Sequence, residues 1–238
     1  MNSFKTAFKH LEKDKIMKFL IKNFGDKIDI TDRYNENYAR AISDLIIEQQ
    51  ISFKVAKTIK KYGIPDIVLL NAGTNNPNSK NIFSIEETEQ IFKINFFGTL
   101  NCLHALLPFL KKKKNTQVIF MSSVAGYRGL PYAAAYCSSK SAITTFAESI
   151  YNQCQNLGIA IRVINPGFVK TPLTDKNKFK MPMIIPVEKA ADIIYKKIIF
   201  SKKFEINCPW LFCFIMKILR ILPNSLYLSL TQLLIKRL

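Results

Sequence analysis

The sequence predicts an α/β fold in which helices cover both faces of a doubly wound, parallel β-sheet. Apolar runs bounded by turn residues alternate with longer helical patterns, which is typical of βαβ units. The 238 residues, of which 48% are hydrophobic, suffice for a single domain with one large core. No internal repeat or linker interrupts the chain before residue 204, where it becomes apolar and basic. We therefore expect one domain over residues 1–203 and a helical extension over residues 204–238.

Short apolar runs predict the strands of the sheet, and longer segments predict the helices between them. Strands are expected over residues 66–70, 118–121 and 159–164. Helices are expected over residues 86–109 and 132–157. The first helix should start near Ser84, and Gly158 stands where a C-terminal cap would close the second.

Tyr136 and Lys140 stand four residues apart at the start of the second helix, so their side chains share one face. A nearby ammonium favours phenolate over phenol, which would lower the tyrosine pKa from its usual value of about 10. Ser123 follows the strand at 118–121, which brings its hydroxyl to an edge of the sheet. The three side chains predict a site that moves a proton on or off a carbonyl oxygen. A serine at a strand end can also simply cap or turn the chain.

The net charge of +18, from 35 Lys and Arg against 17 Asp and Glu, favours anionic partners such as nucleotide phosphates or an acidic membrane surface. Scattered lysines are equally consistent with a compositional bias. The four lysines at 111–114 should only form a solvent-exposed turn. The basic segments carry no interleaved aromatic residues and no zinc-ligand spacing, so we expect no nucleic-acid binding.

The cysteines and histidines give no support for a metal site or a disulfide framework. Five cysteines form no C-x-x-C pair, and the chain has only two histidines. Residues 1–20 are charged throughout and lack the apolar core of a signal peptide. We therefore expect reduced thiols and a cytoplasmic protein.

Several motifs follow one another in a fixed order: Asn71-Ala72-Gly73 after the first strand, Asn95 in N-F-F-G, S-S-V-A-G from Ser122, Y-C-S-S-K from Tyr136 and N-P-G-F-V-K-T from Asn165. In this combination the chain resembles the short-chain dehydrogenase/reductase (SDR) family over about residues 25–238. The resemblance implies a Rossmann-like fold. The stretch from Thr171 to Ala190 resembles a bacterial subgroup of SDR oxidoreductases.

The resemblance implies hydride exchange between NAD or NADP and a carbonyl or secondary alcohol. Tyr136 would give its proton to the developing alkoxide, and Lys140 would lower the tyrosine pKa and bind the nicotinamide ribose. Ser123 would hold the carbonyl oxygen as a preorganised donor. Asn95 would hold a water in a proton relay, although an asparagine here can also kink or cap a helix.

Further residues would contact the cofactor if the resemblance extends to binding. Asn71, Ala72 and Gly73 bring small residues to a strand end, where backbone must approach a ligand, although N-A-G also suits an ordinary turn. Pro166 and Gly167 would guide the chain around the nicotinamide. Thr171 would meet its carboxamide or cap a helix ahead of Pro172. Asp32 would favour NAD through the adenosine ribose and Asp44 would meet adenine, but Arg33 argues for NADP, so the choice stays open.

One family motif is absent. SDR proteins open with a T-G-x-x-x-G-x-G turn that lets backbone approach the pyrophosphate, whereas residues 1–24 here contain no glycine. Residues 19–33 resemble the end of the first helix and the second strand, which predicts an incomplete or divergent first βαβ unit. Three explanations stay open: a misassigned start, lysines that replace the amide cradle, or a loss of catalysis.

The extension over residues 204–238 is apolar and interrupted by Lys217 and Arg220, so no run reaches the 18 or so residues of a membrane span. It suits an interfacial helix on the inner membrane surface, a subunit contact in a homo-oligomer, or a lid over a lipophilic substrate. The leading hypothesis is thus an NAD(P)-dependent oxidoreductase acting on a small carbonyl or alcohol substrate. The alternative is a catalytically impaired protein of the same fold with a binding or scaffolding role.

Overall fold

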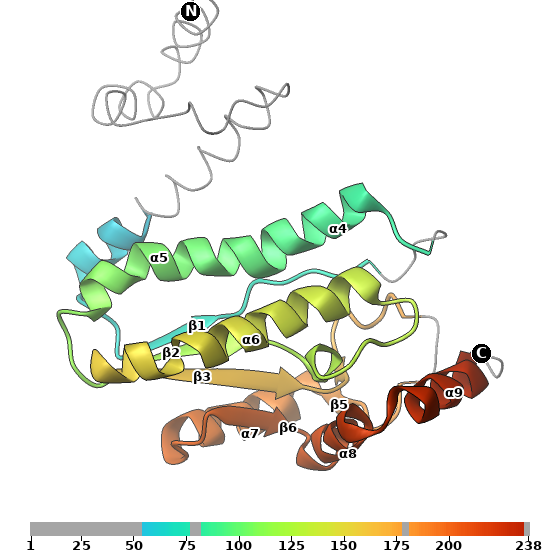
Figure 1. The fold of residues 1–238 in the computed structure, drawn as a ribbon. Coiled ribbons are helices and arrows are strands. Elements are labelled where there is room, and N and C mark those ends of the chain that lie inside the picture. The colour runs from blue at the N-terminus through green and yellow to red at the C-terminus, as the bar shows by residue number, and fades with distance from the viewer. Residues whose placement is uncertain (1–53, 77–81, 178–180, 236–238) are drawn as a thin grey trace, which may run out of the picture. The chain divides into compact units, whose positions relative to one another are not determined.

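The computed structural model describes residues 54–76, 82–177 and 181–235 (Figure 1). A helix over residues 54–62 precedes a four-stranded parallel sheet with the order β1-β2-β3-β6. Its strands are β1 (Ile67–Leu70), β2 (Thr116–Met121), β3 (Ile159–Pro166) and β6 (Glu205–Cys208). A separate parallel pair, β4 (Val169–Lys170) and β5 (Ile185–Pro186), lies between β3 and β6 in the sequence.

Helices cover both faces of the sheet, as Figure 1 shows. One face carries α4 (Ile85–Phe92), η3 (Lys93–Phe97), α5 (Gly98–Leu110) and α6 (Ala134–Asn156), and the other carries α7 (Val187–Phe200). Side chains alternate along the strands: Val118 and Phe120 join the core under α5 and α6, whereas Ile119 packs towards α7. The predicted α/β fold with a doubly wound parallel sheet is therefore confirmed for the described residues.

The helix predicted over residues 86–109 is confirmed as the continuous run from α4 to α5. Ser84 caps it as expected, because its Oγ accepts a hydrogen bond from the backbone N–H of Glu87 at 3.2 Å. The middle of the run is a π-helix, η3, with Asn95 fully buried in it. Such single π-turns are frequent at functional sites.

The helix predicted over residues 132–157 begins two residues later, as α6, and ends where expected. Gly158 follows it with a φ of +75°, the left-handed conformation that a glycine adopts at low cost. Strand β3 follows at once and carries a buried arginine, Arg162. Its guanidinium donates to the carbonyls of Lys197 and Ile198 at the last turn of α7, each at 2.9 Å. These bonds fix α7 against the sheet through the carbonyls of its last turn.

The C-terminal extension differs from its prediction as a purely helical segment from residue 204. Residues Glu205–Cys208 first complete the sheet as β6, pairing with β3 from Val163 to Pro166. The helical part then consists of α8 (Trp210–Ile221) and α9 (Asn224–Ile235). A four-residue strand next to a long apolar run has too weak a pattern to separate from it in sequence. Among the described residues, no helix is long and apolar enough to cross a bilayer.

Candidate active site

Three of the predicted catalytic side chains come together at the carboxyl edge of the sheet. Ser123 lies just beyond β2, and Tyr136 and Lys140 stand on the first turns of α6. The turn η4 (Val124–Gly126) joins these elements, and Ser123 caps it by accepting from the N–H of Ala125 at 3.1 Å. The cap fixes the direction in which the serine hydroxyl points.

The side chain of Ser123 lies close enough to Tyr136 to influence the pKa of its hydroxyl. Part of the tyrosine ring is exposed, but its hydroxyl lies deep among protein atoms. Burial raises the pKa of Tyr136 because it disfavours the phenolate, and the nearby Ser123 side chain lowers the pKa by less. The phenol is therefore held in its protonated form. The nearby serine hydroxyl can hydrogen-bond to the same carbonyl oxygen as the phenol.

Lys140 lies close to the tyrosine without a direct bond to its hydroxyl. Its Nζ is 5.7 Å from the ring centroid of Tyr136 and donates to the backbone carbonyl of Met121 at 2.9 Å. The side chain is only 3% exposed, and this burial lowers the pKa of Lys140 to about 8. The expectation that Lys140 lowers the tyrosine pKa is not met in this structure, because burial raises the pKa of Tyr136.

Asn95 lies at the same site, but its side chain forms hydrogen bonds with the backbone of a neighbouring segment. Its Oδ1 accepts from the N–H of Thr74 at 2.7 Å, and its Nδ2 donates to the carbonyl of Thr74 and to Ser139 Oγ, each at 3.0 Å. Ser139 Oγ in turn donates to the carbonyl of Tyr136 at 2.8 Å. Asn95 thus locks the segment after β1 to the start of α6. Its predicted role in a water relay stays a prediction.

The backbone after β1 approaches this group closely. Asn71, Ala72 and Gly73 are exposed at the end of the strand. A Cβ atom on Gly73 would lie 3.1 Å from Lys140 Nζ and 3.5 Å from Asn95 Oδ1, so a larger residue would crowd both side chains. Open backbone beside a buried lysine fits the ribose and nicotinamide half of a dinucleotide, as expected at the carboxyl end of a parallel strand.

The segment after β3 faces Ser123 from the other side. Pro166 presents its carbonyl to Ser123 Oγ at 3.4 Å, and Gly167 donates its N–H to the carbonyl of Cys208 at 2.7 Å. A Cβ on Gly167 would lie 2.5 Å from the ring of Phe212 on α8, so only glycine fits there. Thr171 opens a turn in which its carbonyl accepts from the N–H of Thr174 at 2.9 Å. Residues 172–176 form a turn and no helix, so Thr171 caps no helix here, and its predicted contact with the cofactor stays a prediction.

Two further serines belong to the site and were not foreseen as functional residues. Ser122 Oγ donates to the carbonyl of Lys140 at 2.9 Å, which fixes α6 against the end of β2. Ser139 lies three residues after Tyr136 and therefore on the same face of the helix. Its Oγ accepts a hydrogen bond from Asn95 Nδ2. The spacing within Y-C-S-S-K could have indicated the second serine. The contact of Ser122 depends on how β2 and α6 pack.

A surface hollow opens beside the tyrosine. It is lined by residues 75–76, 82–84, 87, 88, 91 and 132–136. A carbonyl compound bound in this hollow would lie next to Tyr136. Asp32, Asp44 and the missing glycine-rich turn lie outside the described residues. Within the described parts of the chain, no three His, Cys, Asp or Glu side chains gather as metal ligands, and all five cysteines are free thiols.

Comparison with known proteins connects this geometry to a family. Residues 26–181 match the family model described as short chain dehydrogenase. An uncharacterized oxidoreductase of Myxococcus xanthus is 33% identical over 162 residues, covering 68% of this chain and 64% of the relative. The matched part is thus somewhat less than two thirds of that relative's length.

Solved structures share the fold at low identity. A short chain dehydrogenase of Burkholderia cenocepacia in complex with NADP superposes with a TM-score of 0.61 at 20% identity, covering 71% of this chain and 70% of the other. A short chain dehydrogenase/reductase of Burkholderia phymatum in complex with NAD gives 0.62 at 17% identity, with the same coverages. The match to the family model over most of the described sheet, together with this shared fold, shows that the chain belongs to the short-chain dehydrogenase family.

Proposed function

We propose that this protein is an NAD(P)-dependent oxidoreductase that exchanges hydride with a carbonyl or secondary alcohol. The observation that carries the proposal is the meeting of Ser123, Tyr136 and Lys140 beside exposed backbone at the end of β1. Structural neighbours crystallised with NADP and with NAD support a nicotinamide cofactor without deciding between the two.

Each side chain has a chemical task in the proposed reaction. The nicotinamide, when bound, would supply or accept the hydride. Ser123 would donate a hydrogen bond to the carbonyl oxygen, where negative charge develops during reduction. Tyr136 would give that oxygen its proton, and Lys140 would hold the ribose hydroxyls from its position beside Gly73. Burial raises the pKa of Tyr136, so the phenol keeps the proton that the reduction of a carbonyl requires.

Nucleotide binding is the direct test of this proposal. We expect millimolar NADH or NADPH to raise the melting temperature, because a ligand that binds only the folded state stabilises it by mass action. ADP serves as the control for general binding of phosphate by a chain of net charge +18. A shift with neither dinucleotide beyond that with ADP would refute the oxidoreductase proposal and favour the scaffolding alternative.

We further propose that α8 and α9 dock peripherally on an anionic lipid surface. Their exposed apolar side chains include Trp210 (66%), Phe214 (55%), Ile221 (80%) and Leu228 (61%). Residues 206–238 contain four Lys or Arg and no Asp or Glu. Lys217 is paired with Glu205, and the other three basic residues have no acidic neighbour in this stretch of sequence. An apolar face with this excess of positive charge suits acidic headgroups, and it is consistent with a lipophilic substrate.

Vesicle sedimentation tests the lipid proposal. The wild type should bind vesicles that contain phosphatidylglycerol better than vesicles of phosphatidylcholine alone. The pair Phe214→Ser and Ile218→Ser should weaken binding about tenfold, because each change removes apolar area from the docking face. The control Phe200→Ser alters an exposed phenylalanine on α7 and should bind normally. A pair variant that binds vesicles normally but loses self-association in light scattering would instead show that this face forms a homo-oligomer.

A further inference from the structure

The loop between the catalytic serine and the catalytic tyrosine is held almost entirely by the C-terminal forty residues. Tyr127, Arg128 and Gly129, the first residues after η4, each form a hydrogen bond with β6, α8 or α9. The loop therefore depends on an element that is remote in sequence. The individual bonds between this loop and the C-terminal elements show how they affect the substrate side of the site.

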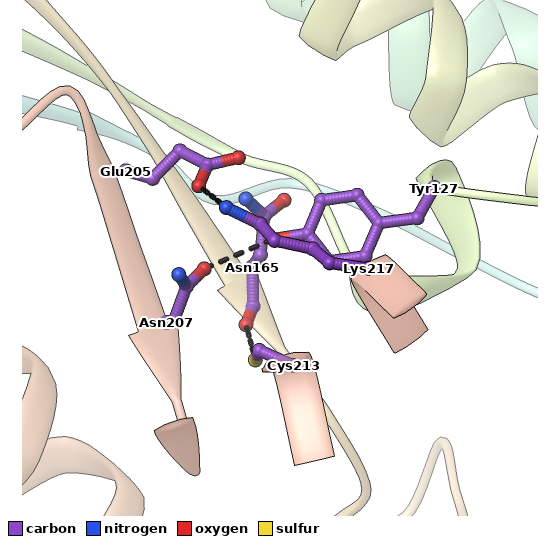
Figure 2. Close-up of polar contacts among 6 residues, drawn as sticks. All are labelled: Tyr127, Asn165, Glu205, Asn207, Cys213 and Lys217. Carbon is purple, nitrogen blue, oxygen red and sulfur yellow. Dashed lines mark hydrogen bonds and ion pairs between the residues drawn. The ribbon is translucent and has the colours of Figure 1, made fainter. Parts of the chain in front are cut away.

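Tyr127 begins the contact in the polar cluster of Figure 2, where β3, β6 and α8 meet. Its hydroxyl donates to Asn207 Oδ1 at 3.0 Å, and Lys217 Nζ lies 5.6 Å from its ring centroid. Lys217 forms an ion pair with Glu205, which ties α8 to β6. Cys213 Sγ donates to the carbonyl of Asn165 at 3.2 Å, directly before the Pro166–Gly167 turn. The cluster thus fixes α8 behind the active site.

Arg128 makes three hydrogen bonds at the corner between α8 and α9. Its guanidinium donates to the carbonyl of Arg220 at 2.6 Å, to the carbonyl of Leu222 at 3.0 Å and to Asn224 Oδ1 at 2.6 Å. These carbonyls lie at the end of α8, where helix carbonyls lack internal partners. The same group lies 4.3 Å from the ring centroid of Tyr227, a cation–π distance. One side chain therefore holds the loop to both helices.

Tyr227 closes the contact from α9. It is 5% exposed, and its hydroxyl donates to the carbonyl of Gly129 at 2.6 Å. One residue further on, the N–H of Leu130 donates to Cys137 Sγ on α6 at 3.4 Å. Between these bonds and the catalytic Tyr136 lie only residues 131–135, most of which line the hollow beside the tyrosine. A shift of the loop would move that wall.

We propose that Arg128 and Tyr227 are positioning residues through which α8 and α9 set the wall of the substrate hollow. This inference rests on the proposed function, since it assigns the hollow to the substrate. Neither residue touches the reacting atoms. Their effect should appear in how well larger substrates are held, and less in the chemical step.

The test uses Arg128→Gln and Tyr227→Phe in the full chain. Arg220→Lys is the control for the first, because it changes a neighbouring arginine but keeps the backbone carbonyl that Arg128 binds. Tyr195→Phe, at an exposed position on α7, is the control for the second variant. Hydrogen–deuterium exchange of residues 127–133 should accelerate about tenfold in both test variants, because each loses a bond that holds the loop. Exchange in β2 should not change.

Kinetics with 2-butanone and 2-octanone give the second measurement. We expect KM for 2-octanone to rise about fivefold or more in Arg128→Gln while KM for 2-butanone and kcat stay near the wild-type values, because a displaced wall misplaces the longer chain. A lower melting temperature with unchanged loop exchange and an unchanged ratio of the two KM values would overturn the proposal and leave a purely structural role. Faster exchange without a change in that ratio would overturn it as well. Loop exchange is measured without turnover, so failure of the oxidoreductase proposal itself remains distinguishable.

Discussion

Tyr136→Phe is expected to lower kcat by about 10³-fold while leaving the binding of the nicotinamide nucleotide within a few-fold of the wild type. A positioned proton donor contributes about 10²–10⁴-fold to such a step, and the variant removes only the hydroxyl that lies near Ser123. The ring and its place at the start of α6 remain. The measurement is the steady-state reduction of 2-octanone, followed by loss of nicotinamide absorbance.

Tyr195→Phe is the matched control for this variant, since it removes a tyrosine hydroxyl from the exposed face of α7. It should keep the wild-type rate. Equal rates in Tyr136→Phe and the wild type would show that another group delivers the proton, and the assignment of the site would fail. Loss of nucleotide binding together with activity would show that the substitution disturbs the cofactor site.

Lys140→Met is expected to remove a component of the pH dependence of stability worth about 3 kcal/mol. Burial lowers the pKa of Lys140 from 10.5 to about 8 in the folded state. Between these two values the unfolded chain binds a proton at this lysine and the folded chain does not, so stability rises with pH. Each unit of pKa difference corresponds to about 1.4 kcal/mol, which gives the stated magnitude.

The measurement is urea unfolding of both proteins from pH 8 to above pH 10.5. The free energy of unfolding of the wild type, minus that of Lys140→Met, should rise by about 3 kcal/mol across this range because the desolvated charge is lost. Lys189→Met, at an exposed position on α7, should run parallel to the wild type. A wild type parallel to Lys140→Met would mean that the lysine is hydrated in solution. The burial described for Lys140 would then be incorrect.

The same burial explains an apparent conflict within the site. A cation near a phenol should lower the phenol pKa, yet both groups here are displaced towards their uncharged forms. Desolvation is the largest cause of both shifts, and it acts on each group separately. A ligand that brought charge or hydroxyl groups next to Lys140 would shift this balance.

Local patterns predicted most of the elements that carry the site. The run 118–121 is apolar and bounded by turn residues, and it lies within β2; Gly158 ends α6 because glycine readily adopts a left-handed backbone. The four-residue spacing of Tyr136 and Lys140 placed both on one helix face, as found. The family resemblance is confirmed by the match over residues 26–181. These features depend on near neighbours in the chain, so the sequence contains them directly.

The partners of the site residues could not be predicted in this way, because they come from segments far apart in the chain. Asn95 binds Thr74 and Ser139, and Lys140 binds the carbonyl of Met121. The strand β6 gave no separate signal, since its four residues merge with the apolar extension. The sequence by itself thus determined the family, the order of elements and the reactive side chains. Only the tertiary structure decided the protonation tendencies of those side chains and the attachment of the catalytic loop to α8 and α9, because both depend on burial and on contacts made after the chain has folded.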